Sequence, residues 1–398
     1  MIVPELDERD ARFAKLRAAA RAQGLDALIV AGKGHWWTGR GAIRYLTDFH
    51  LWGHDGLVLL PLDRDPVLVM TSYAVAAKMA RRGWVTDARG DVYLAPVMAD
   101  AVREAGLESA RIGLVGERSI LGAGVRDELA AALPGVRFTR ADELFDRVRA
   151  VKSPLELEQT KALWGDVLAA MTRFQETVRP GVLGSDIAAE ITRPLWAAGA
   201  RDILIFMGEQ PDEVTLPKPE PLRCDDKTRF HLEVCGPSGH WCEVTINLAW
   251  KPPTAAEARL MDAEVDAFER IRAAARPGVR LSDLAALFEA TLREHGMEIH
   301  GTTDHFDFHG QGMDTIEYPW HAQTPPWGQS QDWPLEAGMV FSYHPRRQVV
   351  GYRGWSTGLN EDIVITEQGA ERLSGGWDQR WRPMAEPARS QEAQHGNR

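Results

Sequence analysis

RPGVLGSDI occupies residues 179–187, and a near copy, RPGVRLSDL, occupies residues 276–284. Each copy follows a long stretch with helical periodicity and precedes another such stretch. Pro-Gly is a typical helix stop, and Ser185 or Asp186 is a typical cap for the helix that follows. The same helix–turn–helix unit, used twice at a spacing of 97 residues, predicts an internally duplicated domain. The seam between two similar halves is a frequent place for a pocket.

The sequence around this repeat predicts the rest of the duplicated domain. Ser153, with Pro154 after it, is expected to cap a long amphipathic helix that runs to about Thr177. Apolar runs typical of strands cover residues 202–208, 228–236, 241–250, 338–345 and 361–374.

In the first part of the chain, predicted strands alternate with predicted helices. Residues 7–24 predict a helix that ends at Gly24, and buried-strand patterns follow at 25–32, 55–62, 65–72 and 110–116. Alternating strands and helices indicate a mixed sheet with helices packed on it. We therefore predict an N-terminal domain over residues 1–150, a catalytic domain over 151–385, and a polar, disordered tail over 386–398.

Composition excludes several classes of protein. The formal net charge of -11 and a pI near 5.6 disfavour nucleic-acid binding, which needs a basic surface. No apolar run approaches the roughly 18 residues of a membrane span, and the acidic N-terminus is unlike a signal peptide. The three cysteines predict free thiols in a reducing compartment. These features predict a cytoplasmic protein that binds neither nucleic acid nor membrane.

Five ionisable side chains lie in or beside apolar strand patterns. They are Glu233, Glu243, His309, His344 and Glu361. Burying such groups is costly unless they pair, coordinate a metal or take part in chemistry. Three Glu and two His could hold one or two divalent cations of the Mn, Fe, Co or Zn type, which would activate water for hydrolysis.

Residues 150–375 resemble the catalytic domain of the creatinase/prolidase/aminopeptidase P superfamily, known as the pita-bread fold. The resemblance rests on VRAVKSPLELEQ, the RPGV turns, HFDFHGQGMDTIEYP, LEAGMVFSYHP and GLNEDIVITEQGAERLS. IRYLTDFHLWGHDGLVLLP resembles that family's N-terminal domain. The resemblance implies an α/β (α+β) chain in which a creatinase-like mixed α/β domain precedes a duplicated pita-bread domain.

Members that bind metal use Asp, Asp, His, Glu and Glu on two cations. By resemblance, Glu233 falls near the first Asp and Glu243 matches the second. His309 matches the His, His344 stands where the fourth ligand is a Glu, and Glu361 matches the final Glu.

Two further positions follow from the resemblance. His305 matches a His that binds substrate or the transition state, and Glu317 matches the Glu of a His-Glu pair whose His is replaced by Ile316. We therefore predict His305, His309, Glu317 and His344 as catalytic, and Glu233, Glu243, His309, His344 and Glu361 as metal ligands.

The departures from the family's ligand set leave two mechanisms open on equal terms. In one, Glu243, His309, His344 and Glu361, with Glu233, hold a divalent metal whose water attacks an amide or amidine carbon, and His305 stabilises the oxyanion. In the other, no metal binds, His309 or His344 is the general base, and Glu317 and Glu361 hold a positively charged substrate.

The N-terminal domain is expected to complete the site, since in relatives it reaches the pocket of the partner subunit. Arg40, Arg44, His50, Trp52 and His54, together with Glu233, are the predicted substrate-binding residues. An Arg suits a substrate carboxylate, and a Trp suits a cationic or apolar group. The Pro/Trp-rich segment 318–333 is expected to form the rim of the pocket.

The sequence predicts a homodimeric hydrolase of a small amide, amidine or ring C–N substrate. The alternatives are an Xaa-Pro-type aminopeptidase or dipeptidase, a lyase on the same fold, and an inactive binding module. The ionisable residues kept at the site positions argue against the last of these.

Overall fold

The computed structural model describes residues 4–35, 38–210, 215–297, 304–305, 308–321, 331–343, 346–347, 358–378 and 380–384. The N-terminal domain is built on one sheet with strand order β4-β3-β2-β1-β5-β6. The β1–β2 and β2–β3 pairs are antiparallel and the other pairs are parallel, which confirms the mixed sheet. The strands are β1 Ala27–Lys33, β2 Asp55–Pro61, β3 Val67–Met70, β4 Asp87–Gly90, β5 Arg111–Val115 and β6 Arg137–Arg140.

Helices and apolar side chains cover this sheet on both faces. Alternation along β1 sends Leu28 and Val30 into one buried cluster and Ile29 and Ala31 into another. The helices are α1 Pro4–Ala22, α2 Gly41–Thr47, α3 Tyr73–Arg82, α4 Leu94–Glu104, α5 Ala123–Ala132 and α6 Asp142–Ala150. No helix in the described part of the chain has the length and apolar character needed to cross a membrane.

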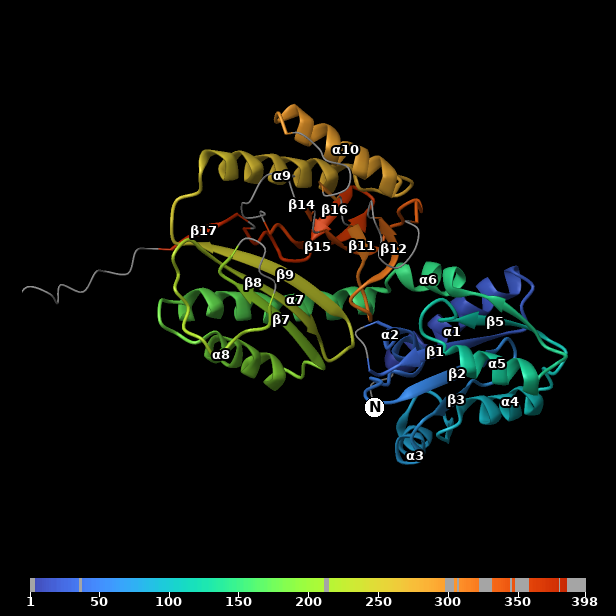
Figure 1. The fold of residues 1–398 in the computed structure, drawn as a ribbon. Helices are drawn as coiled ribbons and strands as arrows, with labels where there is room; N and C mark the ends of the chain where they lie inside the picture. The colour runs from blue at the N-terminus through green and yellow to red at the C-terminus, as the bar shows by residue number, and fades with distance from the viewer. Residues whose placement is uncertain are drawn as a thin grey trace, which may run out of the picture.

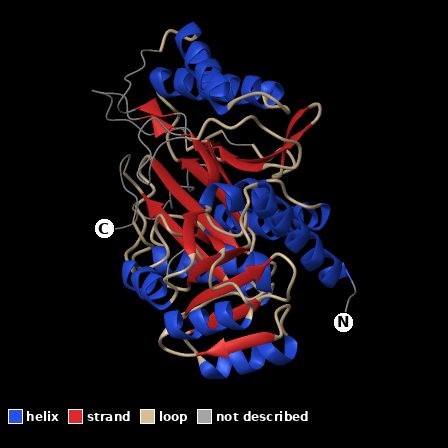
Figure 2. Ribbon diagram, turned by 90° about the vertical axis from the view of Figure 1, so that its right-hand side faces the viewer, coloured by secondary structure: helices blue, strands red, loops and turns tan. Residues whose placement is uncertain are grey.

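The repeated helix–turn–helix unit is present twice, as the sequence predicts. The first copy is α7 Pro154–Thr177 with α8 Gly184–Ala197, and the second is α9 Ala255–Ala274 with α10 Leu281–Glu294. Gly181 and Gly278 take φ values of 85° and 89° at the two turns, a conformation that favours glycine. Figure 1 shows the two helix pairs on opposite sides of the strands, and Figure 2 shows the strands between groups of helices.

The helix starts are only partly as predicted. Ser153 forms a complete capping box with Glu156 at the start of α7. The predicted Ser185 or Asp186 cap is wrong, because α8 begins at Gly184 and Leu183 is its N-cap without a side-chain hydrogen bond. The first amides of α8 instead donate to the carbonyls of Glu220 and Lys218 in a loop that crosses the helix end.

Two main sheets lie between the helix pairs. One has the order β17-β9-β8-β7 and the other β12-β11-β13-β15-β16, while β10 and β14 pair separately. The strands are β7 Asp202–Gly208, β8 Lys227–Cys235, β9 Trp241–Ala249, β10 Asp304–His305, β11 Phe308–Gly310, β12 Glu317–His321, β13 Val340–Tyr343, β14 Arg346–Arg347, β15 Glu361–Thr366, β16 Gly369–Arg372 and β17 Arg382–Pro383.

One predicted strand is a hairpin. Residues 361–374 form β15 and β16, which pair antiparallel around a turn at Glu367 and Gln368. Gly369 closes the turn with a φ of 131°, which explains why the chain reverses at a sequence that otherwise looks like one long strand. The predicted tail, 386–398, lies outside the described residues.

Candidate active site

The candidate site is on one face of the β7–β8–β9 part of the sheet. Glu233 of β8 lies directly opposite Glu243 of β9, and His231 lies opposite Thr245. Residues two apart on a strand share a face, so these four side chains point the same way. Two carboxylates opposite each other repel, and this arrangement is stable when a positive group lies beside them.

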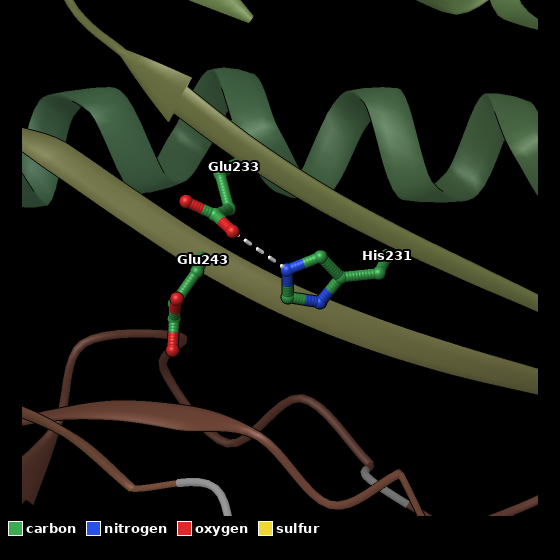
Figure 3. A group of neighbouring side chains, drawn as sticks. All are labelled: His231, Glu233 and Glu243. Atoms are coloured by element: carbon green, nitrogen blue, oxygen red, sulfur yellow. Dashed lines mark hydrogen bonds and ion pairs between the residues drawn. The ribbon is translucent and has the colours of Figure 1, made fainter. Parts of the chain in front are cut away.

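His231 supplies part of that positive charge. Its Nε2 lies 3.1 Å from Glu233 Oε1 and its Nδ1 lies 2.9 Å from Thr245 Oγ1, as Figure 3 shows for the contact with Glu233. Phe206 of β7 stacks on the ring at 6.0 Å. Burial alone would lower the pKa of His231, but the hydrogen bond and charge of Glu233, with the charge of Glu243, raise it above 6.5. The two carboxylates therefore stabilise the charged form of His231.

Glu243 is more deeply buried than its neighbour and is held by the second sheet. Its Oε1 accepts hydrogen bonds from Ser342 Oγ and from Asn360 Nδ2, the latter at 2.9 Å. Its backbone N–H donates to Asp362 Oδ2 at 3.3 Å. In Figure 3 its carboxylate extends towards the ribbon of the C-terminal strands. The two sheets therefore meet at Glu243, which places the site between the two halves of the domain.

His309, a predicted site residue, lies against this carboxylate. Its Nδ1 is 3.0 Å from the carbonyl oxygen of Gly310, so in the neutral ring that nitrogen carries the proton and donates it. Nε2 then has a lone pair and lies 3.7 Å from Glu243 Oε1. A lone pair facing a carboxylate, with the other ring nitrogen bonded to a backbone carbonyl, is typical of a histidine that binds a cation.

Glu361, predicted as a metal ligand, lies on the other side of its strand. Its carboxylate accepts hydrogen bonds from Arg372 Nε at 2.8 Å and from Ser374 Oγ at 2.6 Å. The neighbours Asn360 and Asp362 are the residues that contact Glu243. Since side chains alternate along a strand, the place expected for Glu361 beside Glu243 is taken by Asn360.

Glu317, predicted as catalytic, is part of a buried ion cluster at the domain junction. Its carboxylate lies 2.7 Å from Lys152 Nζ and 3.3 Å from Arg149 Nη1. It also accepts from the backbone amide of Met313 at 2.8 Å. Arg149 in turn contacts Asp314, whose carboxylate accepts from the amides of Gly39 and Gly41 in the N-terminal domain. These contacts indicate a structural role for Glu317.

Through Gly39 and Gly41, the same cluster holds the segment that contains the predicted substrate-binding residues Arg40 and Arg44. Arg40 bonds Asp202 at 2.8 Å, at the end of β7. Arg44 contacts Asp48 and the carbonyl of Pro237. Burial, together with the charges of Arg44, Arg40 and Arg201, lowers the pKa of His50 to about 4. His50 is therefore neutral at physiological pH.

Two other predicted residues of this domain are further towards solvent. Trp52 is 69% exposed, and His54 is half-buried with its carbonyl accepting from Gly34. Asp202 pairs with Cys235, two residues beyond Glu233. The structure thus brings Arg40 of this chain to the end of the sheet that carries the candidate site. A contribution from a partner subunit stays a prediction.

Several predictions fall outside the described residues. His344 and most of segment 318–333 are not described, and for His305 only the backbone pairing with Arg346 is. Conversely, the sequence prediction missed His231, Ser342 and Asn360. His231 had a usable signal, because in His-Leu-Glu it shares the strand face of Glu233.

One group of described side chains could hold a cation. His231, Glu233 and Glu243 each offer a ligand atom, and these atoms lie within 4.8 Å of one another. Within the described ranges they are the one group of three such residues, which fits one cation rather than two. Asn360 beside Glu243 is an amide where a second cation would need a carboxylate.

Two family models match the chain. Residues 12–151 match the Creatinase/Prolidase N-terminal domain, and residues 214–367 match Metallopeptidase family M24. The ectoine hydrolase of Halomonas elongata is 24% identical over 402 residues, covering 92% of this chain and 95% of that protein.

Solved structures show the same fold. The dipeptidase PepE of Mycobacterium ulcerans superimposes with a TM-score of 0.75 at 20% identity, covering 95% of this chain and 98% of that one. The X-Pro aminopeptidase of Thermotoga maritima gives a TM-score of 0.74 at 18% identity, covering 94% and 99%. The chain therefore belongs to the creatinase/prolidase/aminopeptidase P superfamily, whose M24 members hydrolyse C–N bonds.

Proposed function

We propose that this hydrolase cleaves a C–N bond in a small ring compound that carries a positively charged amidine, of the ectoine type, rather than an Xaa-Pro peptide bond. The observation that carries the proposal is the facing pair Glu233 and Glu243, with His231 beside them and Asn360 in contact with Glu243. Two carboxylates at the seam of the two sheets suit a cationic amidine. The full-length similarity to an ectoine hydrolase supports the same class of substrate.

In the proposed reaction Glu233 and Glu243 bind and orient the positive amidine. Water attacks the amidine carbon and forms a C–O bond, and its proton passes to Glu243. The C–N bond of the resulting tetrahedral centre then breaks as the leaving nitrogen takes a proton from the His231–Glu233 pair, and the hydroxyl proton of that centre returns to the pair as the amide C=O forms. Glu243 passes its proton to the released amine, which leaves as an ammonium group. Thr245, which contacts His231 Nδ1, and Phe206, which stacks on its ring, keep the imidazole in place.

A divalent cation fits the same residues. Glu243, Glu233 and His231 would hold it, with His309 Nε2 adjacent to Glu243. When bound, such a cation supplies a Lewis acid and lowers the pKa of a coordinated water. Binding of the substrate's positive group and of a cation would use the same carboxylates, so high concentrations of Mn²⁺ are expected to compete with substrate.

The test is hydrolysis of ectoine by the purified chain, followed by NMR. We expect turnover, and we expect Glu243→Gln to lower kcat by roughly 10²- to 10⁴-fold while the protein stays folded. Glu190→Gln is the matched control, because Glu190 is paired with Arg173 on the surface of α8. Absence of ectoine hydrolysis by the native chain, or unchanged turnover in Glu243→Gln, would overturn the proposal.

A further inference from the structure

The face that carries His231 and the two glutamates continues by one more row of side chains. Arg229 is two residues before His231 on β8, and it lies opposite Asn247 of β9. Arg229, His231 and Glu233 therefore point to the same side, with neighbouring rows about 7 Å apart along the strand. The face is negative at the Glu233 end and positive at the Arg229 end.

Arg229 is held in a defined orientation. Its Nε donates to Asn247 Oδ1 at 3.2 Å, and Asn247 is only 3% exposed. Gly358 makes room for this amide, because a Cβ there would lie 2.4 Å from Asn247 Nδ2, and its φ is 64°. With Nε bonded to Asn247, the plane of the guanidinium is fixed relative to the sheet.

Strand β7 leaves the side of Arg229 that faces it without a side chain. Gly208 of β7 lies opposite Arg229, so that strand places no side chain over it. Arg229 is half-buried, as are His231 and Glu233, whereas Glu243 is buried. The charge of Arg229 also acts on His231, where it opposes the protonated form. Arg229 is therefore close enough to the site for its charge to affect His231.

We infer that Arg229 is a specificity-determining residue that binds a carboxylate of the substrate, one row away from the bond that is cleaved. The inference rests on the proposed function and deepens it. The substrate is then a compact zwitterion, with its positive C–N group at Glu233 and Glu243 and its carboxylate at Arg229. A guanidinium is suited to this because it donates two parallel hydrogen bonds to a carboxylate.

The test compares two probes in two proteins. Ectoine and its methyl ester, which lacks the negative charge, are offered to the native chain and to Arg229→Gln. For the native chain we expect kcat/KM to be roughly 10- to 100-fold higher for ectoine than for the ester, since a hydrogen-bonded charge contributes about that factor. In Arg229→Gln the two probes are expected to be nearly equal, through a higher KM for ectoine with kcat little changed.

Controls separate this inference from loss of structure and from failure of the proposed function. Arg173→Gln removes a surface arginine and should keep the native preference. Arg229→Lys should recover part of the preference, because it restores the charge without the two parallel donors. If the native chain cleaves ectoine but Arg229→Gln keeps the full preference, the inference falls and the proposed function stands. If the native chain neither binds ectoine by calorimetry nor cleaves it, both fall.

Discussion

Replacing Glu317 by Gln separates a structural carboxylate from a catalytic one. Glu317 is 2% exposed, and its partners Lys152 and Arg149 are 6% and 9% exposed. Removing one partner of a buried ion pair leaves an uncompensated charge and costs about 3–5 kcal/mol. The amide of Gln can still accept from Met313, so we expect the lower end, a loss of about 3 kcal/mol in the free energy of unfolding.

The assay is urea unfolding followed by tryptophan fluorescence, with kcat measured on the folded protein in the same preparation. Glu317→Gln should unfold at a lower urea concentration and keep kcat within about threefold, a change below 1 kcal/mol in the activation barrier. Glu233→Gln is the matched comparison, because we expect it to lose activity with little change in stability. An unchanged urea midpoint with a large loss of kcat in Glu317→Gln would refute our assignment and restore Glu317 to the site.

Three further predictions follow from the buried acids and their neighbours. Asn360→Glu adds a carboxylate beside Glu243 and should raise Mn²⁺ affinity in calorimetry, whereas Glu361→Gln should leave it unchanged; equal effects would contradict the strand register. His240 and Arg12 outweigh burial and lower the pKa of Glu156 to about 2. Its charge therefore stabilises the fold above pH 4.5, and about 3 kcal/mol of the free energy of unfolding is lost as pH falls towards 2. An acid titration in which Glu156→Gln unfolds at the same pH as the native chain would contradict this. After loading with Mn²⁺ and removal of excess, elemental analysis should find no more than one ion per chain, and two would be inconsistent with the ligand group.

Much of the fold was predictable because its signals are local. Each RPGV turn combines a helix stop with a glycine at positive φ. Ser153 and Glu156, which form the N-terminal capping box of α7, lie within four residues of sequence. These patterns depend on neighbours in the chain. The cap of α8 was not predictable in this way, because the loop that satisfies its amides comes from residues 218–220.

The candidate site was predicted less well than the fold, because successive side chains of a strand point to opposite faces of the sheet. A shift of one residue moves a side chain to the opposite face. Asn360 and Glu361 differ by that one step, and the resemblance favoured the carboxylate over the amide that contacts Glu243. The contacts of Glu317 could not be predicted for another reason: its partners Arg149 and Lys152 are more than 160 residues away in the chain, and no local sequence pattern indicates them.

Whether this chain acts on a small charged ring compound can be measured directly. The direct measurement is the ratio of kcat/KM for ectoine to kcat/KM for an alanyl-proline dipeptide, with and without added Mn²⁺. We expect the ring compound to be the better substrate by at least about tenfold, a difference of about 1.4 kcal/mol in transition-state binding, under both conditions. A higher kcat/KM for the dipeptide, especially after Mn²⁺ is added, would contradict the proposed substrate class.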